Sequence, residues 1–194
     1  MLIHAVEKAI NAAYKGAKDL SHAQRSAAWV SALADELRAC SEAFAADGEI
    51  VVFCRANERN RPEFRTNELL FDILVAEIRT VQSVRGKRLQ ALSKALWVVE
   101  SELKRTDSRD VLIDLNKLVV AQAINKILVI SGSTSLVDWA QKMMAMLLDP
   151  KESNVFLVTI PHPADWSEPF SQRAEVYQMT PEAHWLTIPS SGQP

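Results

Sequence analysis

Residues 96–104 have the sequence LWVVESELK, and this segment decides the fold that the sequence predicts. The segment opens as a continuous apolar run, which is typical of a strand that is buried on both faces of a sheet. It then carries Glu100, Glu102 and Lys104 at alternating positions. Because side chains alternate across a strand, we expect these three charged groups on one face. They require a partner, a metal ion or solvent, since an unpaired buried charge is costly.

A further carboxylate interrupts the preceding apolar segment, residues 68–78, whose sequence is ELLFDILVAEI. Asp72 lies inside this run, although aspartate is disfavoured in strands. If the two strands are neighbours, Asp72 lies beside Glu102, and the two carboxylates could hold a hard cation such as Mg²⁺. A cation held in this way activates a water molecule and neutralises charge on a phosphate. The sequence therefore predicts a metal site at Asp72 and Glu102, with Lys104 acting at the water.

The segments around these two strands predict further helices and strands. Helices are expected over residues 2–18, 22–46, 110–124 and 134–148, and strands over residues 49–55, 68–78, 95–104, 126–131, 154–160 and 183–188. Residues 79–94 are expected to form a loop or a hairpin end. Three strands with short connections favour an antiparallel meander, and the later alternation of strand and helix favours parallel crossovers. We therefore expect an α/β protein with a mixed β-sheet flanked by helices.

An acidic residue on one strand, followed by Glu-x-Lys on the next, resembles the PD-(D/E)xK nuclease superfamily, which has a restriction-endonuclease-like core. The core of that superfamily has the order helix, three strands, helix and strand, and residues 22–131 have the same predicted order. The resemblance implies one domain over residues 1–194, in which residues 1–20 add an N-terminal helix and residues 132–194 add an α/β extension. Phe71 stands where the superfamily motif has a proline before the aspartate.

The resemblance also implies a function, namely a metal-dependent endodeoxyribonuclease that hydrolyses DNA phosphodiester bonds in restriction, repair or phage defence. The implied catalytic residues are Asp72, Glu102 and Lys104. Asp72 and Glu102 would bind Mg²⁺ or Mn²⁺. Candidate auxiliary acids are Glu36, in the first core helix, Glu68 and Glu100. A homodimer is expected if the protein cuts duplex DNA, because each copy would supply one site.

Basic residues gather between residues 79 and 105, where the local charge is 7 − 2 = +5. A basic loop beside an acidic strand end suits the phosphate backbone of DNA. Lys117, in the helix after the acidic strand, could also contact a phosphate, and the alternative is that it belongs to the polar face of that helix. The predicted nucleic-acid-binding residues are Arg85, Lys87, Arg88 and Lys117. A weaker candidate is the arginine-rich segment with Arg55, Arg59, Arg61 and Arg65.

Composition excludes several classes of protein. The 194 residues include 22 basic and 24 acidic ones, so the net charge of −2 argues against a polybasic arm but not against a local basic patch. The two cysteines and four scattered histidines argue against a disulfide scaffold and a zinc site. No apolar run approaches the roughly 20 residues of a membrane helix, and Glu7 and Lys8 interrupt the first apolar segment. A cytoplasmic protein is therefore expected.

Two other kinds of function stay open at this point. The same fold could serve as a catalytically inactive module that binds protein or nucleic acid, with its acidic residues in a structural ion pair or at an exposed strand end. An unrelated mixed α/β domain with a small-ligand pocket would bring no acidic cluster together and would bind no metal.

Overall fold

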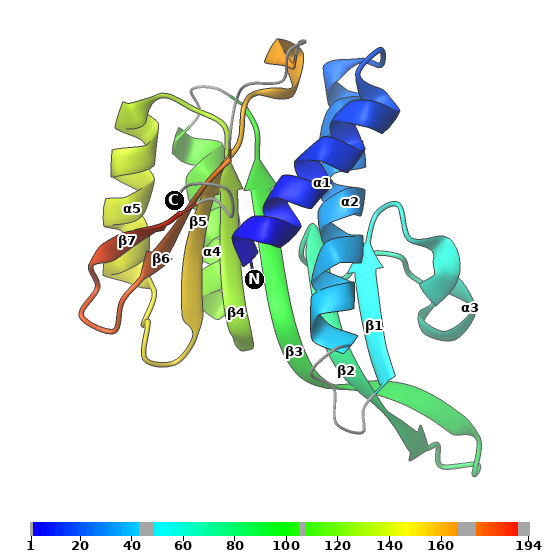
Figure 1. Ribbon diagram of the computed structural model, residues 1–194. Helices are drawn as coiled ribbons and strands as arrows, with labels where there is room; N and C mark the ends of the chain where they lie inside the picture. Colours follow the sequence, from blue (N-terminus) through cyan, green and yellow to red (C-terminus); the bar gives the residue numbers. More distant parts are fainter. Residues whose placement is uncertain (1, 43–48, 105–107, 167–173, 190–194) are drawn as a thin grey trace.

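The computed structural model describes residues 2–42, 49–104, 108–166 and 174–189, and in these residues seven strands form one mixed sheet (Figure 1). The strands are β1 (Glu49–Cys54), β2 (Ile73–Gln82), β3 (Arg88–Glu102), β4 (Ala123–Ile130), β5 (Asn154–Thr159), β6 (Glu175–Met179) and β7 (Trp185–Ile188). They lie side by side in the order of the sequence. β3, β4 and β5 are parallel to one another, and every other neighbouring pair is antiparallel. The expected α/β architecture with a mixed sheet is confirmed.

Helices cover both faces of this sheet (Figure 1). They are α1 (Leu2–Ala17), α2 (His22–Glu42), α3 (Arg61–Phe64), α4 (Ser108–Val120) and α5 (Thr134–Leu147), with short 3₁₀ turns η1 (Glu58–Asn60) and η2 (Pro163–Asp165). α1 and α2 pack on one face, and α4 and α5 pack on the other. Each of these four helices buries an apolar stripe against the sheet, which is the usual source of helix stability in a protein.

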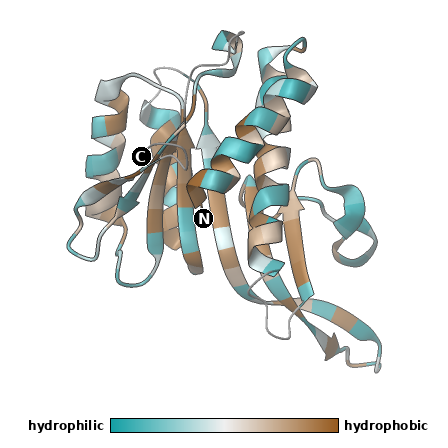
Figure 2. Ribbon diagram, viewed as in Figure 1, coloured by the Kyte–Doolittle hydropathy of each residue, from teal (hydrophilic) through white to brown (hydrophobic). Residues whose placement is uncertain are grey.

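The middle strands are buried on both faces, which explains their continuous apolar runs. Figure 2 shows these strands as mainly hydrophobic and the outer faces of the helices as mainly hydrophilic. Along β3, Val99 packs on the side of α1 and α2, whereas Val98 packs on the side of α4 and α5. The same alternation directs Glu100 toward α4 and Ser101 toward α2. The end of β3 therefore presents different polar groups to the two helical layers.

Most of the predicted elements are present, with ends shifted by a few residues. The helix predicted over residues 22–46 extends to Glu42, and residues 43–46 lie outside the described residues. The helix predicted over 110–124 ends at Val120, and β4 begins at Ala123. Within the described residues, no helix is both long enough and apolar enough to span a membrane.

Two parts of the sheet differ from what the sequence specified: one prediction left two alternatives open, and one strand was not predicted. Residues 79–94 were expected to form a loop or a hairpin end, and they form the end of the long β2–β3 hairpin, whose tight turn is closed by a hydrogen bond from Gly86 N to Ser83 O. The hairpin extends past β1, so both of its faces meet solvent and its side chains follow no apolar pattern. β6 was not predicted, because its short sequence EVYQM has no clear apolar alternation.

Candidate active site

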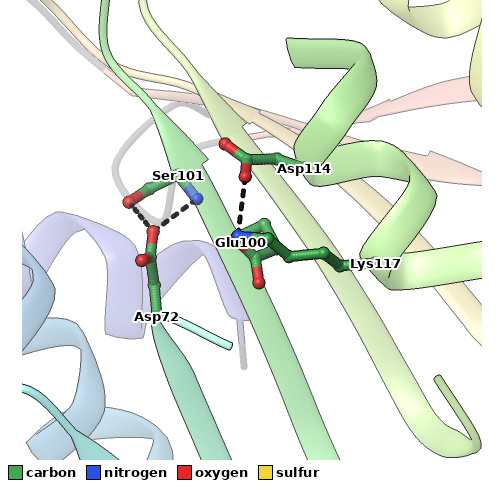
Figure 3. Close-up of polar contacts among 5 residues, drawn as sticks. All are labelled: Asp72, Glu100, Ser101, Asp114 and Lys117. Carbon is green, nitrogen blue, oxygen red and sulfur yellow. Dashed lines mark hydrogen bonds and ion pairs between the residues drawn. The ribbon is translucent and has the colours of Figure 1, made fainter. Parts of the chain in front are cut away.

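Asp72 lies immediately before β2, next to the end of β3 (Figure 3). Its Oδ2 accepts hydrogen bonds from the backbone N of Ser101 at 2.9 Å and from Ser101 Oγ at 2.5 Å. The strand register sets Ile73 opposite Val99, which places Asp72 opposite Glu100. The expected position of Asp72 beside Glu102 is therefore wrong, since β2 pairs with β3 two residues away from the assumed register.

A tight turn sets the position of Asp72. Phe71 N donates a hydrogen bond to Leu69 O at 2.6 Å, and the intervening Leu70 has a φ of 61°. A hydrogen bond between residues i and i+2 around a positive φ is a γ-turn, which is rare and strained. The turn ends the apolar run that was expected to be strand from residue 68, and it leaves the Leu70 side chain 83% exposed.

We expect Leu70→Gly to raise the free energy of unfolding by about 1 kcal/mol, because glycine adopts a positive φ without the clash of a Cβ. Removing the leucine side chain costs little buried apolar area, because that side chain is already exposed. Leu70→Ala is the matched control, since alanine keeps the Cβ and the strain and gains nothing. Urea unfolding of the three proteins measures the effect, and equal stability of the glycine and alanine variants would contradict it.

Glu100 lies on the opposite face of β3 and is completely buried. Its Oε2 accepts a hydrogen bond from Lys117 Nζ at 2.8 Å, and Lys117 Nζ also donates to Asp114 Oδ1 at 2.9 Å (Figure 3). Within the described residues, Glu100 Oε1 has no hydrogen-bond partner. Burial raises the pKa of Glu100 to about 8, the hydrogen bond from Lys117 opposes this rise, and the charges of Asp72 and Asp114 add to it.

Lys117 brings a positive charge to the acidic strand from α4. Partial burial lowers the pKa of Lys117. Its hydrogen bonds to Glu100 and Asp114 raise that pKa by more, so the pKa of Lys117 lies above its ordinary value. The side chain is therefore an ammonium ion at neutral pH, and 42% of it is exposed. Lys117 thus contacts the acidic strand as well as solvent, instead of lying only on the polar face of its helix.

Glu102 and Lys104 form a separate arrangement at the end of β3. Glu102 Oε1 accepts a hydrogen bond from the backbone N of Lys104 at 2.8 Å, and the Lys104 ammonium pairs with Asp110 at the start of α4. Burial raises the pKa of Glu102, while the amide and the charge of Lys104 oppose this rise. The negative charge of Asp72 raises the pKa of Glu100, whereas the acids whose charges raise the pKa of Glu102 are Asp110 and Asp114.

A cleft opens on the α2 side of Asp72, and we call it the Asp72 cleft. Its volume is about 490 Å³, and small side chains of α2 form one wall. The charged and hydroxyl groups that line it beyond α2 are Arg55, Glu68, Asp72 and Ser101. The cleft thus brings Glu68, an expected auxiliary acid, to the same site as Asp72 and makes Asp72 accessible from the surface.

The other predicted residues lie away from this site. Glu36 pairs with Lys8 of α1, at 3.7 Å between Oε2 and Nζ. Arg85, Lys87 and Arg88 lie at the tip of the β2–β3 hairpin (Figure 1). Ten residues of β2 at about 3.3 Å each separate this tip from Asp72 by about 33 Å along the strand. The expectation that this basic cluster lies beside the acidic strand end is therefore wrong, because residues 79–94 continue the strands away from it.

The acidic groups fit a magnesium ion in part. Asp72 and Glu100 offer carboxylate oxygens, and Glu100 Oε1 makes no hydrogen bond to any described residue. No group of three histidine, cysteine or acidic side chains among the described residues could hold a metal ion. Mg²⁺ commonly takes only one or two carboxylates and completes its coordination with water and substrate phosphate. The Asp72 side chain lies with Ser101 on the α2 side of β3 and the Glu100 side chain lies on the α4 side, so a cation bound by both would have to lie across the end of the strand (Figure 3).

The chain matches no family model, no curated protein and no solved structure in comparisons with known proteins. Its function is therefore inferred from the residues and the geometry of the site alone.

Proposed function

We propose that the protein is a metal-dependent nuclease that hydrolyses DNA phosphodiester bonds, and that its catalytic centre consists of Asp72, Glu100 and Lys117. One observation supports the proposal most: the backbone of Asp72 lies opposite Glu100 at the ends of two adjacent strands, the charge of Asp72 acts on the pKa of Glu100, and the Lys117 ammonium lies 2.8 Å from Glu100. The order α2, β1, β2, β3, α4 and β4 supports a restriction-endonuclease-like core. In this assignment α1 and the elements from α5 to β7 are additions to the core.

Each residue has a distinct part in this proposal. A bound divalent cation would supply the Lewis acid that activates water and neutralises charge on the phosphate. Asp72, from the α2 side of β3, and Glu100, from the α4 side, would hold that cation across the end of the strand, and Ser101 would orient Asp72 through its two hydrogen bonds. The Lys117 ammonium would keep Glu100 ionised when the site is loaded, and would stabilise negative charge that develops on the phosphate.

The proposal moves the catalytic lysine from Lys104, the residue of the Glu-x-Lys motif, to Lys117. We expect Lys117→Met to lower Mg²⁺-dependent cleavage of plasmid DNA by about a hundredfold or more, the usual cost of removing one preorganised electrostatic group. Lys104→Met should keep activity within about threefold of wild type, because Lys104 pairs with Asp110 at the end of β3. Because both variants remove one lysine charge, a difference between their activities reports the position of the lysine and not the change in net charge.

The double variant Glu100→Gln with Lys117→Met controls for folding, because it removes the buried charge together with its partner. We expect it to unfold cooperatively, as wild type does, and to stay inactive. Full activity of Lys117→Met, or loss of activity in Lys104→Met alone, would overturn the assignment of the lysine.

One observation favours a second candidate, a catalytically inactive module that binds DNA or protein. Glu100, Lys117 and Asp114 already form a continuous ion-pair network, which needs no metal to compensate the buried charge. This candidate predicts a folded protein that binds its partner and shows no metal-dependent cleavage. The plasmid assay on wild type distinguishes the two candidates directly.

A further inference from the structure

Four arginines follow β1 at the end of the sheet where Asp72 lies. Residues 55–65 contain four arginines and two glutamates, so their local charge is 4 − 2 = +2. All four arginines are exposed, and none of the four guanidinium groups makes an ion pair with another described residue. An exposed guanidinium with no partner is well suited to a phosphate group, which it can bind through two parallel hydrogen bonds.

The backbone that carries these arginines is firmly anchored. Asn57 Nδ2 and Asn60 Nδ2 each donate a hydrogen bond to Val52 O at 2.6 Å, and Asn57 Oδ1 accepts one from Arg59 N at 3.1 Å. Phe64 packs edge to face on Phe53 of β1, with 4.9 Å between the ring centroids. The backbone of the segment is therefore preorganised, and it loses little conformational entropy when the arginines bind a ligand.

The position of the segment connects it to the Asp72 cleft. Arg55 itself lines the cleft, together with Glu68, Asp72 and Ser101. The turn η1 and helix α3, which carry the other arginines, lie beside β1 (Figure 1). The hairpin cluster of Arg85, Lys87 and Arg88 projects from the other end of the same sheet, about 33 Å from Asp72 along β2.

The cleft also has room for part of a DNA strand. Its volume of about 490 Å³ falls within the range of pockets that enclose small organic ligands. One wall consists of the short side chains of Ala23, Ser26 and Ala27, which leave space between α2 and the strand ends. A phosphate at Arg55 would lie at the entrance of the same cleft that exposes Asp72.

We propose that residues 55–65 form the DNA-binding surface of this protein and that Arg55 directs the phosphate backbone into the Asp72 cleft. This inference rests on the proposed nuclease function, whose substrate it places on the molecule. It assigns the main phosphate contacts to the arginines after β1 instead of to the hairpin tip.

The test measures binding of a fluorescein-labelled DNA duplex by anisotropy in EDTA, where metal-dependent cleavage cannot occur. The triple variant Arg55→Ala, Arg59→Ala, Arg61→Ala should lose at least about tenfold in affinity near 0.1 M salt. The slope of log K against log salt concentration should become shallower by about 0.9 for each lost phosphate contact. The charge-matched control replaces three exposed lysines outside residues 55–65, Lys15, Lys142 and Lys151, by alanine, and it should stay within about twofold of wild type.

Three results would overturn the inference. Wild type could show no measurable affinity for DNA, or the arginine variant could bind as tightly as the lysine control. The third is that the hairpin variant Arg85→Ala, Lys87→Ala, Arg88→Ala loses affinity while the arginine variant keeps it. The nuclease proposal is judged separately by cleavage in Mg²⁺. If binding depends on the arginines but wild type does not cleave DNA, the nuclease proposal is contradicted and this inference is not. If wild type cleaves DNA but binding does not depend on residues 55–65, this inference is contradicted and the nuclease proposal is not.

Discussion

Glu100→Gln is expected to make the protein more stable than wild type at pH 8, by on the order of a few kcal/mol, since the loss of the ion pair with Lys117 offsets part of the gain. The pKa of Glu100 is about 8 in the folded protein, against an ordinary value of 4.5. Between these two values the folded state binds a proton that the unfolded state has released, so wild-type stability falls as the pH rises. The favourable contribution of protonated Glu100 is complete below pH 4.5 and is lost as the pH rises to about 8. Glutamine keeps the shape of the side chain and does not ionise.

Urea unfolding at several pH values between 5 and 8 measures this effect. The difference in unfolding free energy between Glu100→Gln and wild type should be small at pH 5 and should widen steadily toward pH 8. Glu36→Gln serves as the control, since Glu36 is partly exposed and makes a long ion pair with Lys8. Parallel curves for wild type and Glu100→Gln across this range would show that Glu100 ionises as an ordinary carboxylate, and would contradict its raised pKa.

The general architecture could be predicted from the sequence because the central strands are buried on both faces. The apolar runs of β4 and β5 have no polar alternation, which is the expected pattern for parallel strands between two helical layers. The β2–β3 hairpin beyond β1 could not be predicted in the same way. Both of its faces meet solvent, so its sequence carries no apolar pattern that would distinguish a strand from a loop.

The site could be predicted only in part, because strand register is not encoded in the spacing of a single strand. The alternation in ESELK correctly predicts that Glu100 and Glu102 share a face, but it does not say which of them lies opposite Asp72. That choice depends on the position of the hairpin turn and on two register shifts in the hairpin, between Val75 and Ala76 and between Glu77 and Ile78.

Two further contacts of the site depend on tertiary packing. Ser101 lies between two glutamates on the other face of β3, and no sequence pattern indicated that it binds Asp72. Lys117 was predicted to contact a phosphate, but its contact with Glu100 follows only from the packing of α4 against β3.

Asp72→Asn is expected to lower metal-dependent DNA cleavage by about a thousandfold or more, because a carboxylate that holds the cation contributes several kcal/mol to the reaction. Asparagine has the same shape, and its side-chain oxygen still accepts the hydrogen bonds from Ser101. We therefore expect the free energy of unfolding to change by less than about 1 kcal/mol. The plasmid assay and urea unfolding measure the two quantities on the same protein.

Ser101→Ala provides a graded comparison for that prediction. It removes the hydroxyl that donates to Asp72 but keeps the backbone N–H, so the carboxylate loses one of its two supports. The loss of activity should be about tenfold to a hundredfold, as is usual for groups that orient a metal ligand. Unchanged cleavage by Asp72→Asn would contradict a catalytic role for Asp72, whatever the effect at Ser101.

The central claim is that Asp72 and Glu100 form one cation site, and calorimetric titration with Mn²⁺ at pH 8 tests it most directly. Higher pH favours ionised Glu100, whose pKa is about 8, and so favours binding. We predict one site in wild type and in Glu102→Gln, and no binding in Asp72→Asn or Glu100→Gln. Absence of binding by wild type even with DNA present, or binding that survives in Glu100→Gln and disappears in Glu102→Gln, would contradict the claim.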